Sequence, residues 1–281
     1  MTGRFDMAHR RDVLRLLFNG AVFAAGGGAA ALASGPAWAR PTAVRPPKLP
    51  GLIETSRAFP DISERIAAIS QGLLGTRYRG HTLIGSPKTS EEFVSREDAF
   101  DCVTFCETVL AAALSARPED FVPALRMIRY HDGIVTYYAR NHYFHEWCAR
   151  NIANGLCREV ELPGMVTIEK TVTWHREFEP RHFTMRVIPA NSVLDHHAML
   201  KNGDIAGFVT RRASLDYFHT GFVMFGRNGK SKGELLLRHA AESRRRVIDE
   251  PMARFLRANR VRYVTVLRPR DPAASTATSK I

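Results

Sequence analysis

The sequence has little cysteine, few acidic residues and no long apolar run beyond its N-terminal part, and each shortage bears on the class of protein. Four cysteines among 281 residues exclude a disulfide-dense scaffold. After residue 39 no stretch approaches the roughly 20 apolar residues of a membrane-spanning helix. Asp and Glu number 28 against 40 Lys and Arg. The resulting basic chain is compatible with nucleic acid, an anionic membrane or an acidic polymer as partner.

The composition is otherwise that of a folded protein. Hydrophobic residues make up 45% of the chain and charged residues 24%, which excludes a disordered chain and a coiled coil. A length of 281 residues allows one large domain or two small ones, with an ample core.

The first 39 residues predict an export signal. Arg10 and Arg11 precede a mildly apolar stretch at 16–33, and Ala-Trp-Ala at 37–39 is typical of a cleavage site. Together these features indicate a twin-arginine signal peptide over 1–39. A membrane anchor is the alternative, but the stretch is short and rich in glycine. We therefore expect a periplasmic protein with no nucleic-acid partner and no stable membrane anchor after signal removal.

The remaining chain divides into three segments. Residues 40–55 begin with four prolines in eleven residues and are predicted to form an extended linker. Residues 56–268 are predicted to form a single domain. Residues 269–281 are small and polar, and we expect a disordered tail there.

Within the domain the hydrophobic period changes along the chain. Apolar residues recur at helical spacing first, and we expect helices at 62–73, 100–116, 118–130 and 144–154. Later runs alternate, and we expect strands at 166–174, 205–210, 218–225, 234–240 and 261–267, with a short helix at 249–258. Residues 78–98 look polar and irregular. Helices followed by strands predict an α+β fold.

Cys102 lies where a reactive thiol is favoured. Asp101 is a good N-cap residue for the helix predicted at 100–116, so Cys102 falls in its first turn. The unpaired N–H groups and positive dipole of a helix N-terminus stabilise a thiolate. We therefore expect Cys102 to be partly exposed and more acidic than a free thiol. A buried structural thiol is the alternative.

The other cysteines leave several alternatives open. Cys106 lies one turn further along the same helix face and could be a core residue, a resolving thiol or a metal ligand. Metal binding would need further ligands such as His142 and His145, and that spacing matches no standard zinc pattern. Cys148 and Cys157 could pair in an oxidising compartment or stay as buried free thiols.

A thiol nucleophile needs a base, and His219 and His239 lie in strand-like runs on either side of an Asn228-Gly229 hairpin signal. A hairpin centred on Gly229 would place the two histidines opposite each other. A tight Asn-Gly turn would instead turn His239 to the other face, so the pair requires a longer loop or a bulge. One imidazole could then act as the base and the other orient it. Ordinary surface histidines are the alternative.

The order of these motifs resembles the NlpC-type papain-like cell-wall hydrolases, and more closely their N-acetylmuramoyl-L-alanine amidase-like branch. The matching segments are Phe-Asp-Cys-Val-Thr-Phe at 100–105, Asn-Gly-Asp-Ile at 202–205, His-Thr-Gly-Phe at 219–222 and His-Ala at 239–240. Gly-Thr-x-Tyr-x-Gly at 75–80 and Arg-x-His-Tyr-Phe at 140–144 are shared as well. The resemblance covers roughly residues 56–268.

The resemblance implies a papain-like fold, with an N-terminal helical part packed on a C-terminal antiparallel sheet and the nucleophile at a helix N-terminus. It implies Cys102 as nucleophile, His219 as base and His239 as the orienting residue, with no cofactor or metal. It also implies supporting or substrate-binding positions, which are Tyr78, Asp101, Thr104, His142 and Tyr143. Asp101 and Thr104 are expected to shape the helix N-terminus. His142 and Tyr143 belong either to a substrate groove or to the core.

The implied activity is thiol-dependent cleavage of an amide bond in peptidoglycan or muropeptides through an acyl-enzyme. Peptidoglycan stem peptides carry carboxylates, which suits a basic protein. Arg211-Arg212 and the arginines at 244–246 are candidate anion contacts, with solvated charged faces as the alternative. The alternative activities are an acyltransferase or lipid deacylase on the same fold, or a non-catalytic wall-binding module.

Overall fold

The structure of the protein is a computed structural model that describes residues 48–173, 179–226 and 232–271. These residues all belong to one compact unit, Pro46–Ile281. The signal peptide predicted at 1–39 and most of the predicted tail, from residue 272, lie outside the described residues. Within the three described ranges, no helix is long and apolar enough to cross a bilayer.

The described part of the chain contains seven α-helices and twelve strands. The helices are α1 (Lys48–Ser56), α2 (Ile62–Gly72), α3 (Cys102–Leu114), α4 (Phe121–Arg129), α5 (Phe144–Ala153), α6 (Ala190–Asp195) and α7 (Met252–Ala258). The strands are β1 (Arg77–Tyr78), β2 (Ile84–Ser86), β3 (Thr89–Glu92), β4 (Ala99–Phe100), β5 (Cys157–Glu159), β6 (Val166–Val172), β7 (Arg181–Pro189), β8 (Ile205–Val209), β9 (Tyr217–Phe225), β10 (Leu235–Ala241), β11 (Arg246–Pro251) and β12 (Tyr263–Pro269).

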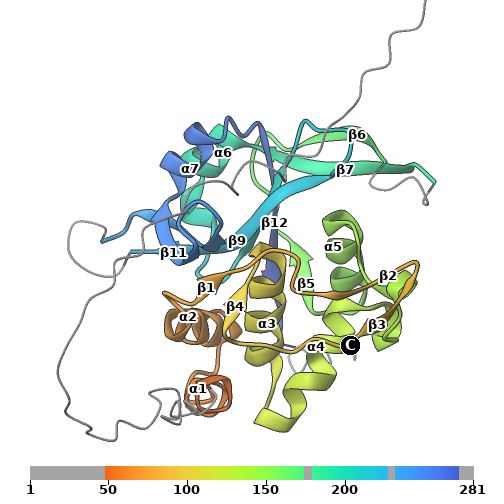
Figure 1. Cartoon of the computed structure of the whole chain (residues 1–281). Coiled ribbons are helices and arrows are strands. Elements are labelled where there is room, and N and C mark those ends of the chain that lie inside the picture. The colour runs from red at the N-terminus through yellow and green to blue at the C-terminus, as the bar shows by residue number, and fades with distance from the viewer. Residues whose placement is uncertain (1–47, 174–178, 227–231, 272–281) are drawn as a thin grey trace, which may run out of the picture. The chain divides into compact units, whose positions relative to one another are not determined.

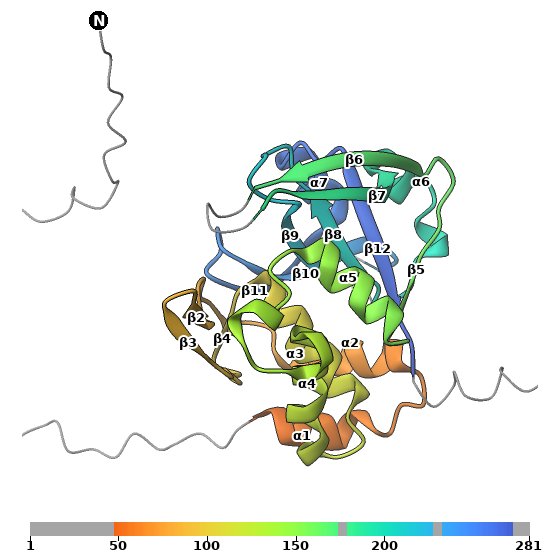
Figure 2. The same cartoon turned by 90° about the vertical axis from the view of Figure 1, so that its right-hand side faces the viewer.

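Most strands form a single sheet. Its order is β4-β1-β11-β10-β9-β8-β12-β7-β6, with β5 also paired to β12, while β2 and β3 form a separate hairpin. The pairs along this sheet are antiparallel except the short parallel pair of β1 with β4. Helices α1 to α5 lie on one side of the long strands, and α6 and α7 lie on the other (Figures 1 and 2). The fold is therefore α+β, as the order of helices and strands predicts.

Apolar side chains gather in two clusters, one on each face of the central strands. Phe222 of β9 packs in the cluster that includes Phe105 of α3. The next residue, Val223, belongs to the opposite cluster, which includes Phe208 of β8 and Phe255 of α7. Consecutive residues of a strand point to opposite faces, so β9 contributes to both cores and positions side chains toward α3 and α7 alternately.

The strongest sequence signals correspond to real elements. The four predicted long helices correspond to α2, to α3, to α4 with the short 3₁₀ turn Pro118–Asp120 before it, and to α5. The five predicted strands correspond to β6, β8, β9, β10 and β12. Helix α2 begins after Asp61, whose side chain accepts a hydrogen bond from the Ser63 backbone N–H. Capping and apolar period were therefore sufficient to locate these elements.

The linker predicted at 40–55 is wrong over its C-terminal part, because α1 begins at Lys48. Leu49 and Ile53 lie one turn apart and are buried in the core. The side chain of Glu97 accepts hydrogen bonds of 2.7 Å from the backbone N–H groups of Lys48 and Leu49, which caps the helix. Pro50 falls in the first turn, where a missing N–H leaves no hydrogen bond unmade.

Two further expectations are corrected. The helix predicted at 249–258 is strand β11 as far as Pro251 and becomes α7 only at Met252. The segment 78–98, expected to be irregular, contains the β2–β3 hairpin. Strand β7, which no pattern predicted, pairs with β6 from Arg181 to Val187.

Candidate functional site

Cys102 is the first residue of α3, directly after a fully formed N-terminal cap. The Asp101 side chain accepts a 2.8 Å hydrogen bond from the Thr104 backbone N–H, and the Thr104 hydroxyl accepts one of 3.0 Å from the Asp101 N–H. This reciprocal capping box fixes the first turn of the helix. Cys102 is half-buried, so its expected position in the first turn and its partial exposure are both confirmed.

The expected acidity of the thiol is wrong for the protein without substrate. Burial raises the pKa of Cys102 to about 12, and the charge of Asp101 raises it further. The backbone N–H groups of Thr220, Val103 and Cys102 act in the opposite direction. The helix N-terminus supplies only about half a positive charge, which does not offset burial beside a carboxylate.

The backbone N–H of Thr220 lowers the pKa of Cys102, so the nucleophile candidate lies against β9. Thr220 directly follows His219 on this strand. The Thr220 hydroxyl also lies 3.8 Å from the sulfur of Cys106, which is buried in α3. Among the described residues, however, the Cys102 sulfur makes no hydrogen bond to the His219 ring. Contacts between a nucleophile and its base are often loose without substrate.

His219 begins a hydrogen-bonded row of three titratable side chains, which we call the imidazole row and which consists of His219, His239 and Glu250. Its Nε2 lies 2.6 Å from Nδ1 of His239 on β10. The His239 Nε2 lies 2.8 Å from an oxygen of Glu250 on β11. Burial, followed by the neighbouring His239, lowers the pKa of His219 to about 3. Burial also lowers the pKa of His239, against the opposing effect of Glu250. Both imidazoles are therefore neutral at neutral pH.

The β9–β10 register differs from the one that would place the histidines directly opposite each other. Phe225 pairs with Leu235 and Phe222 with Arg238, a register in which His239 faces Gly221. The two histidines are therefore diagonal neighbours on the same face of the sheet. The hairpin closes where the Gly226 N–H donates to the Glu234 carbonyl, so the tight Asn-Gly turn is excluded and the longer connection is correct. Its residues 227–231 lie outside the described residues.

Gly221 leaves the space that this diagonal contact needs. A Cβ at Gly221 would lie 2.8 Å from the Cβ of His239 and 2.8 Å from the Arg238 carbonyl oxygen. Neither backbone nor Cβ can move aside as a flexible side chain would. The glycine in the His-Thr-Gly motif therefore leaves space for the imidazole row and is not there to allow an unusual backbone angle.

Glu250 was missed from the sequence because its segment was interpreted as helix. On β11 it pairs in register with Leu237, while His239 pairs with Ile248. It is thus the diagonal neighbour of His239, as His239 is of His219. The signal available was the Val247-Ile248 pair, typical of a strand, followed by Pro251, which is suited to a helix start.

Tyr78 lies close to the nucleophile candidate. Its backbone N–H donates to the Arg245 carbonyl, which holds β1 beside the turn before β11. Burial raises the pKa of Tyr78 to about 12, and the charges of Glu242, Cys102 and Asp101 contribute to the shift. The hydroxyl is therefore within electrostatic range of Cys102.

His142 and Tyr143 lie in the aromatic packing before and within α5. The His142 Nε2 lies 2.6 Å from the Tyr137 carbonyl oxygen, and burial lowers its pKa to about 4. Tyr143 is buried in the larger core and packs edge-on against Phe183 at 5.4 Å. Of the two alternatives for this segment, the structure places Tyr143 in the core.

The remaining cysteines are buried free thiols in the structure. Cys106, Cys148 and Cys157 are all buried, and burial raises the pKa of each. The described residues contain no group of three His, Cys, Asp or Glu side chains suited to holding a metal ion. His142, one of the ligands that the zinc alternative would need, is bound to a backbone carbonyl.

The fold is shared with several solved structures. An N-acetylmuramoyl-L-alanine amidase from Bacteroides uniformis is 24% identical, with a TM-score of 0.65 over 75% of this chain and 99% of that one. A Legionella pneumophila protein assigned to the DUF1460 family is 20% identical, with a TM-score of 0.69 over 80% and 95%. A putative xylanase from Bacteroides fragilis is 24% identical, with a TM-score of 0.61 over 71% and 98%.

At this identity the likeness shows the fold alone. No curated protein matches the chain. The family model described as AmiA-like, N-acetylmuramoyl-L-alanine amidase-like, matches residues 68–264, a range that contains Cys102, His219, His239 and Glu250. The chain therefore belongs to the N-acetylmuramoyl-L-alanine amidase-like family.

Proposed function

We propose that the protein is an exported cysteine amidase that cleaves the bond between N-acetylmuramic acid and L-alanine in peptidoglycan. The family supports a cell-wall hydrolase. The observation that carries the finer proposal is the row His219–His239–Glu250, which starts beside the residue whose N–H faces the Cys102 sulfur. A capped helix N-terminus with a thiol, and a base held by two further groups, is the arrangement of a papain-like, NlpC-type hydrolase.

The row fixes which ring nitrogen of each histidine carries the proton. Glu250 is acceptor-only as a carboxylate, so the His239 Nε2 carries the proton that it accepts. The Nδ1 of neutral His239 is then an acceptor, and it takes the N–H of His219 Nε2. His219 is left with an unprotonated Nδ1, which is the lone pair that can accept the thiol proton. His239 and Glu250 thus position the base by selecting its tautomer.

The depressed pKa of His219 and the raised pKa of Cys102 indicate a neutral thiol–imidazole pair before substrate binds. In the proposed reaction the sulfur attacks the lactyl carbonyl while the thiol proton moves to His219 Nδ1. Backbone N–H groups at the start of α3 stabilise the oxyanion. The proton then passes to the leaving amine of L-alanine, the C–N bond breaks, and a thioester remains. Water, deprotonated by His219, cleaves the thioester and restores the thiol.

The two alternatives have less support. An acyltransferase or lipid deacylase would need a long apolar channel next to the nucleophile. The cavity that Phe218, the neighbour of His219, helps to line has seven charged residues among its fourteen lining residues. A non-catalytic wall-binding module would have no need of the hydrogen-bonded row that fixes the His219 tautomer.

Digestion of purified muropeptides, followed by mass spectrometry of the products, tests the activity. We expect free stem peptide and a sugar product without peptide, and no products from Cys102→Ala. Fragments split within the stem peptide would show an endopeptidase instead. Absence of any product from the wild-type protein would overturn the proposal.

Export by the twin-arginine route is a separate proposal, supported by the sequence of 1–39 alone. Replacing Arg10 and Arg11 together by lysine keeps the charge but removes the paired guanidinium groups of the signal. We expect this double variant to stay in the cytoplasm while the wild type is recovered from the periplasm. An unchanged periplasmic yield would contradict the twin-arginine route.

A further inference from the structure

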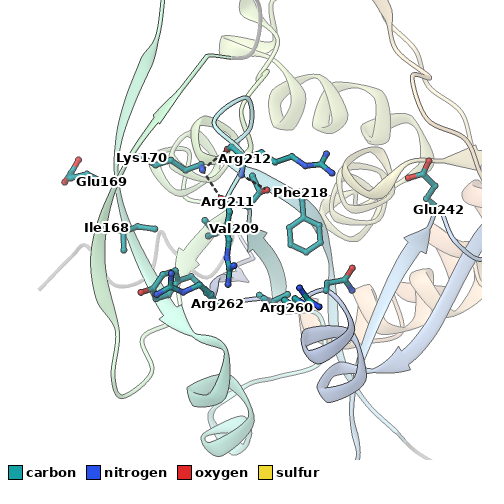
Figure 3. Close-up of a pocket in the computed structure, with 14 residues that line it drawn as sticks. Ile168, Glu169, Lys170, Val209, Arg211, Arg212, Phe218, Glu242, Arg260 and Arg262 are labelled. Atoms are coloured by element: carbon teal, nitrogen blue, oxygen red, sulfur yellow. Dashed lines mark hydrogen bonds between the residues drawn. The ribbon is translucent and has the colours of Figure 1, made fainter. Parts of the chain in front are cut away.

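A cavity of about 640 Å³ lies on the α7 side of the sheet, between β6, the end of β8 and the segment that joins α7 to β12. Figure 3 shows Arg211, Arg260 and Arg262 around its interior, with Phe218 on the wall nearest β9 and Glu242 further along. Its volume is that of a small-ligand site.

The cavity is cationic and its cations are largely unneutralised. Five basic side chains line it, against two acidic ones, Glu169 and Glu242. The Lys170 ammonium is hydrogen-bonded to the cavity wall, because it donates to the carbonyls of Thr210 and Arg212. The other four basic residues, Arg211, Arg212, Arg260 and Arg262, are exposed, and within the described ranges no carboxylate forms an ion pair with any of them.

Arg260 occupies a backbone position at which glycine is normally found. Its φ of 50° lies in the left-handed region. The Arg260 N–H donates to the Arg257 carbonyl and the Val261 N–H to the Leu256 carbonyl, which is the Schellman pattern that ends a helix with a left-handed residue. A side chain with a Cβ is disfavoured by this backbone conformation, and Arg260 nevertheless stands here and lines the cavity with three other arginines.

The cavity adjoins the imidazole row. Phe208 pairs with His219 and Val209 with Tyr217, so Phe218 is the extra residue of a bulge and lies on the same face as His219. The rings of Phe218 and His219 are 6.4 Å apart and both pack against Phe255. At the other end of the cavity, the charge of Glu242 raises the pKa of Tyr78, and the charge of Cys102 raises it as well.

We propose that this cavity binds the carboxylates of the peptide that leaves with the amine, through Arg211, Arg212, Arg260 and Arg262. The inference rests on the proposed function, in which His219 protonates the leaving amine, so that the leaving peptide departs on the side of His219 and Phe218. Guanidinium groups bind carboxylates in a planar, bidentate manner. A peptide with two or more carboxylates beyond its first residue matches a cavity with four arginines.

The specificity experiment compares two muropeptide substrates at 0.15 M salt. One carries free carboxylates on D-glutamate and diaminopimelate, and the other carries carboxamides there. We expect wild-type kcat/KM to favour the free carboxylates about tenfold or more. In the double variant Arg211→Gln/Arg260→Gln the preference should vanish through KM, with kcat kept.

The matched control is Arg57→Gln/Lys88→Gln, which removes two exposed positive charges outside the cavity and should keep the preference. Equal cleavage of both substrates by the wild type, or an equal loss of preference in the control, would overturn the proposal while leaving the amidase activity intact.

Binding of the free product peptide separates this inference from the proposed function. L-alanyl-γ-D-glutamyl-diaminopimelate is a product of the proposed reaction, so calorimetry can use the wild-type protein. We expect binding that weakens about tenfold or more in Arg211→Gln/Arg260→Gln and is unchanged in the control. Binding without any muropeptide cleavage would refute the amidase and keep the cavity assignment. Inorganic phosphate binding as tightly as the peptide would overturn the assignment.

Discussion

Arg238 and His239 are adjacent on β10, and each is joined to a carboxylate on β11, yet the two pairs differ in kind. On the α2 side, Arg238 makes two 2.7 Å hydrogen bonds to Asp249 and also bonds Ser70 and Gln71 of α2. On the α7 side, His239 bonds Glu250 and His219. A guanidinium stays charged at any relevant pH, whereas an imidazole can carry or release a proton.

The difference shows how one strand pair serves structure and chemistry at once. On one face a permanent charge, buried and fully bonded, fastens helix α2 to the sheet. On the other face a neutral imidazole and a carboxylate fix the tautomer of a base. Substitutions on the first face should change stability, and substitutions on the second should change rate.

The largest effect is expected from His219→Ala. Nucleophile and base act as a unit, so muropeptide cleavage should fall by about 10⁴-fold or more, as with Cys102→Ala. The free energy of unfolding by urea should change less than in Arg238→Met, because His219 makes no charged contact in the fold. Activity of His219→Ala within tenfold of the wild type would contradict the proposed difference between the two faces of the sheet.

His239→Ala should leave a measurable residue of activity. The base remains but loses the acceptor that holds its Nε2 proton, so its tautomer is no longer fixed. We expect about tenfold to a hundredfold more activity than in His219→Ala, by analogy with the orienting member of other triads. Single-turnover rates on one muropeptide would show this, and equal activity of the two variants would contradict the orienting role.

Arg238→Met tests the structural face. Removing one partner of a buried pair typically destabilises by 3–5 kcal/mol. Because Asp249 is 26% exposed, we expect the lower end, about 3 kcal/mol, in the free energy of unfolding by urea. The exposed Arg57→Met is the control. Under conditions in which Arg238→Met is folded, below its unfolding midpoint in urea, its kcat should equal that of the wild type. A fall in kcat as large as that of His239→Ala would contradict the distinction between the two faces.

The smallest effect is a pH dependence of stability from His219. An unfolded histidine takes up a proton below about pH 6.5, whereas burial keeps the folded His219 neutral down to about pH 3. Its contribution is therefore full above pH 6.5 and decreases as the pH falls toward 3. Urea unfolding at pH 7.0, 5.5 and 4.5 should show a shallower loss in His219→Gln than in the wild type. Parallel curves would indicate that His219 takes up its proton over the same pH range in the folded and the unfolded protein.

Local signals predicted the elements whose determinants lie close together in the sequence. Asp101 and Thr104 are three residues apart and cap α3 as expected. The acidity of Cys102 could not be predicted in the same way, because it depends on burial and on the approach of Thr220, more than 100 positions later.

The imidazole row was predictable only in part. The two histidines and their common face follow from the strand pattern, but the register depends on a loop, and it made them diagonal rather than opposite. Glu250 required knowledge of a third strand. Likewise α1 was interpreted as linker because its cap, Glu97, lies 48 residues beyond Leu49.

The Glu97 cap also bears on how far the chain can be shortened from its N-terminal side. Its carboxylate holds the N–H groups of Lys48 and Leu49, and Leu49 and Ile53 are buried below. Within the described residues, an exopeptidase trimming from the N-terminal side would therefore meet bonded backbone at Lys48. A recombinant fragment starting at residue 56 would uncover that part of the core, whereas one starting at residue 46 would keep it closed.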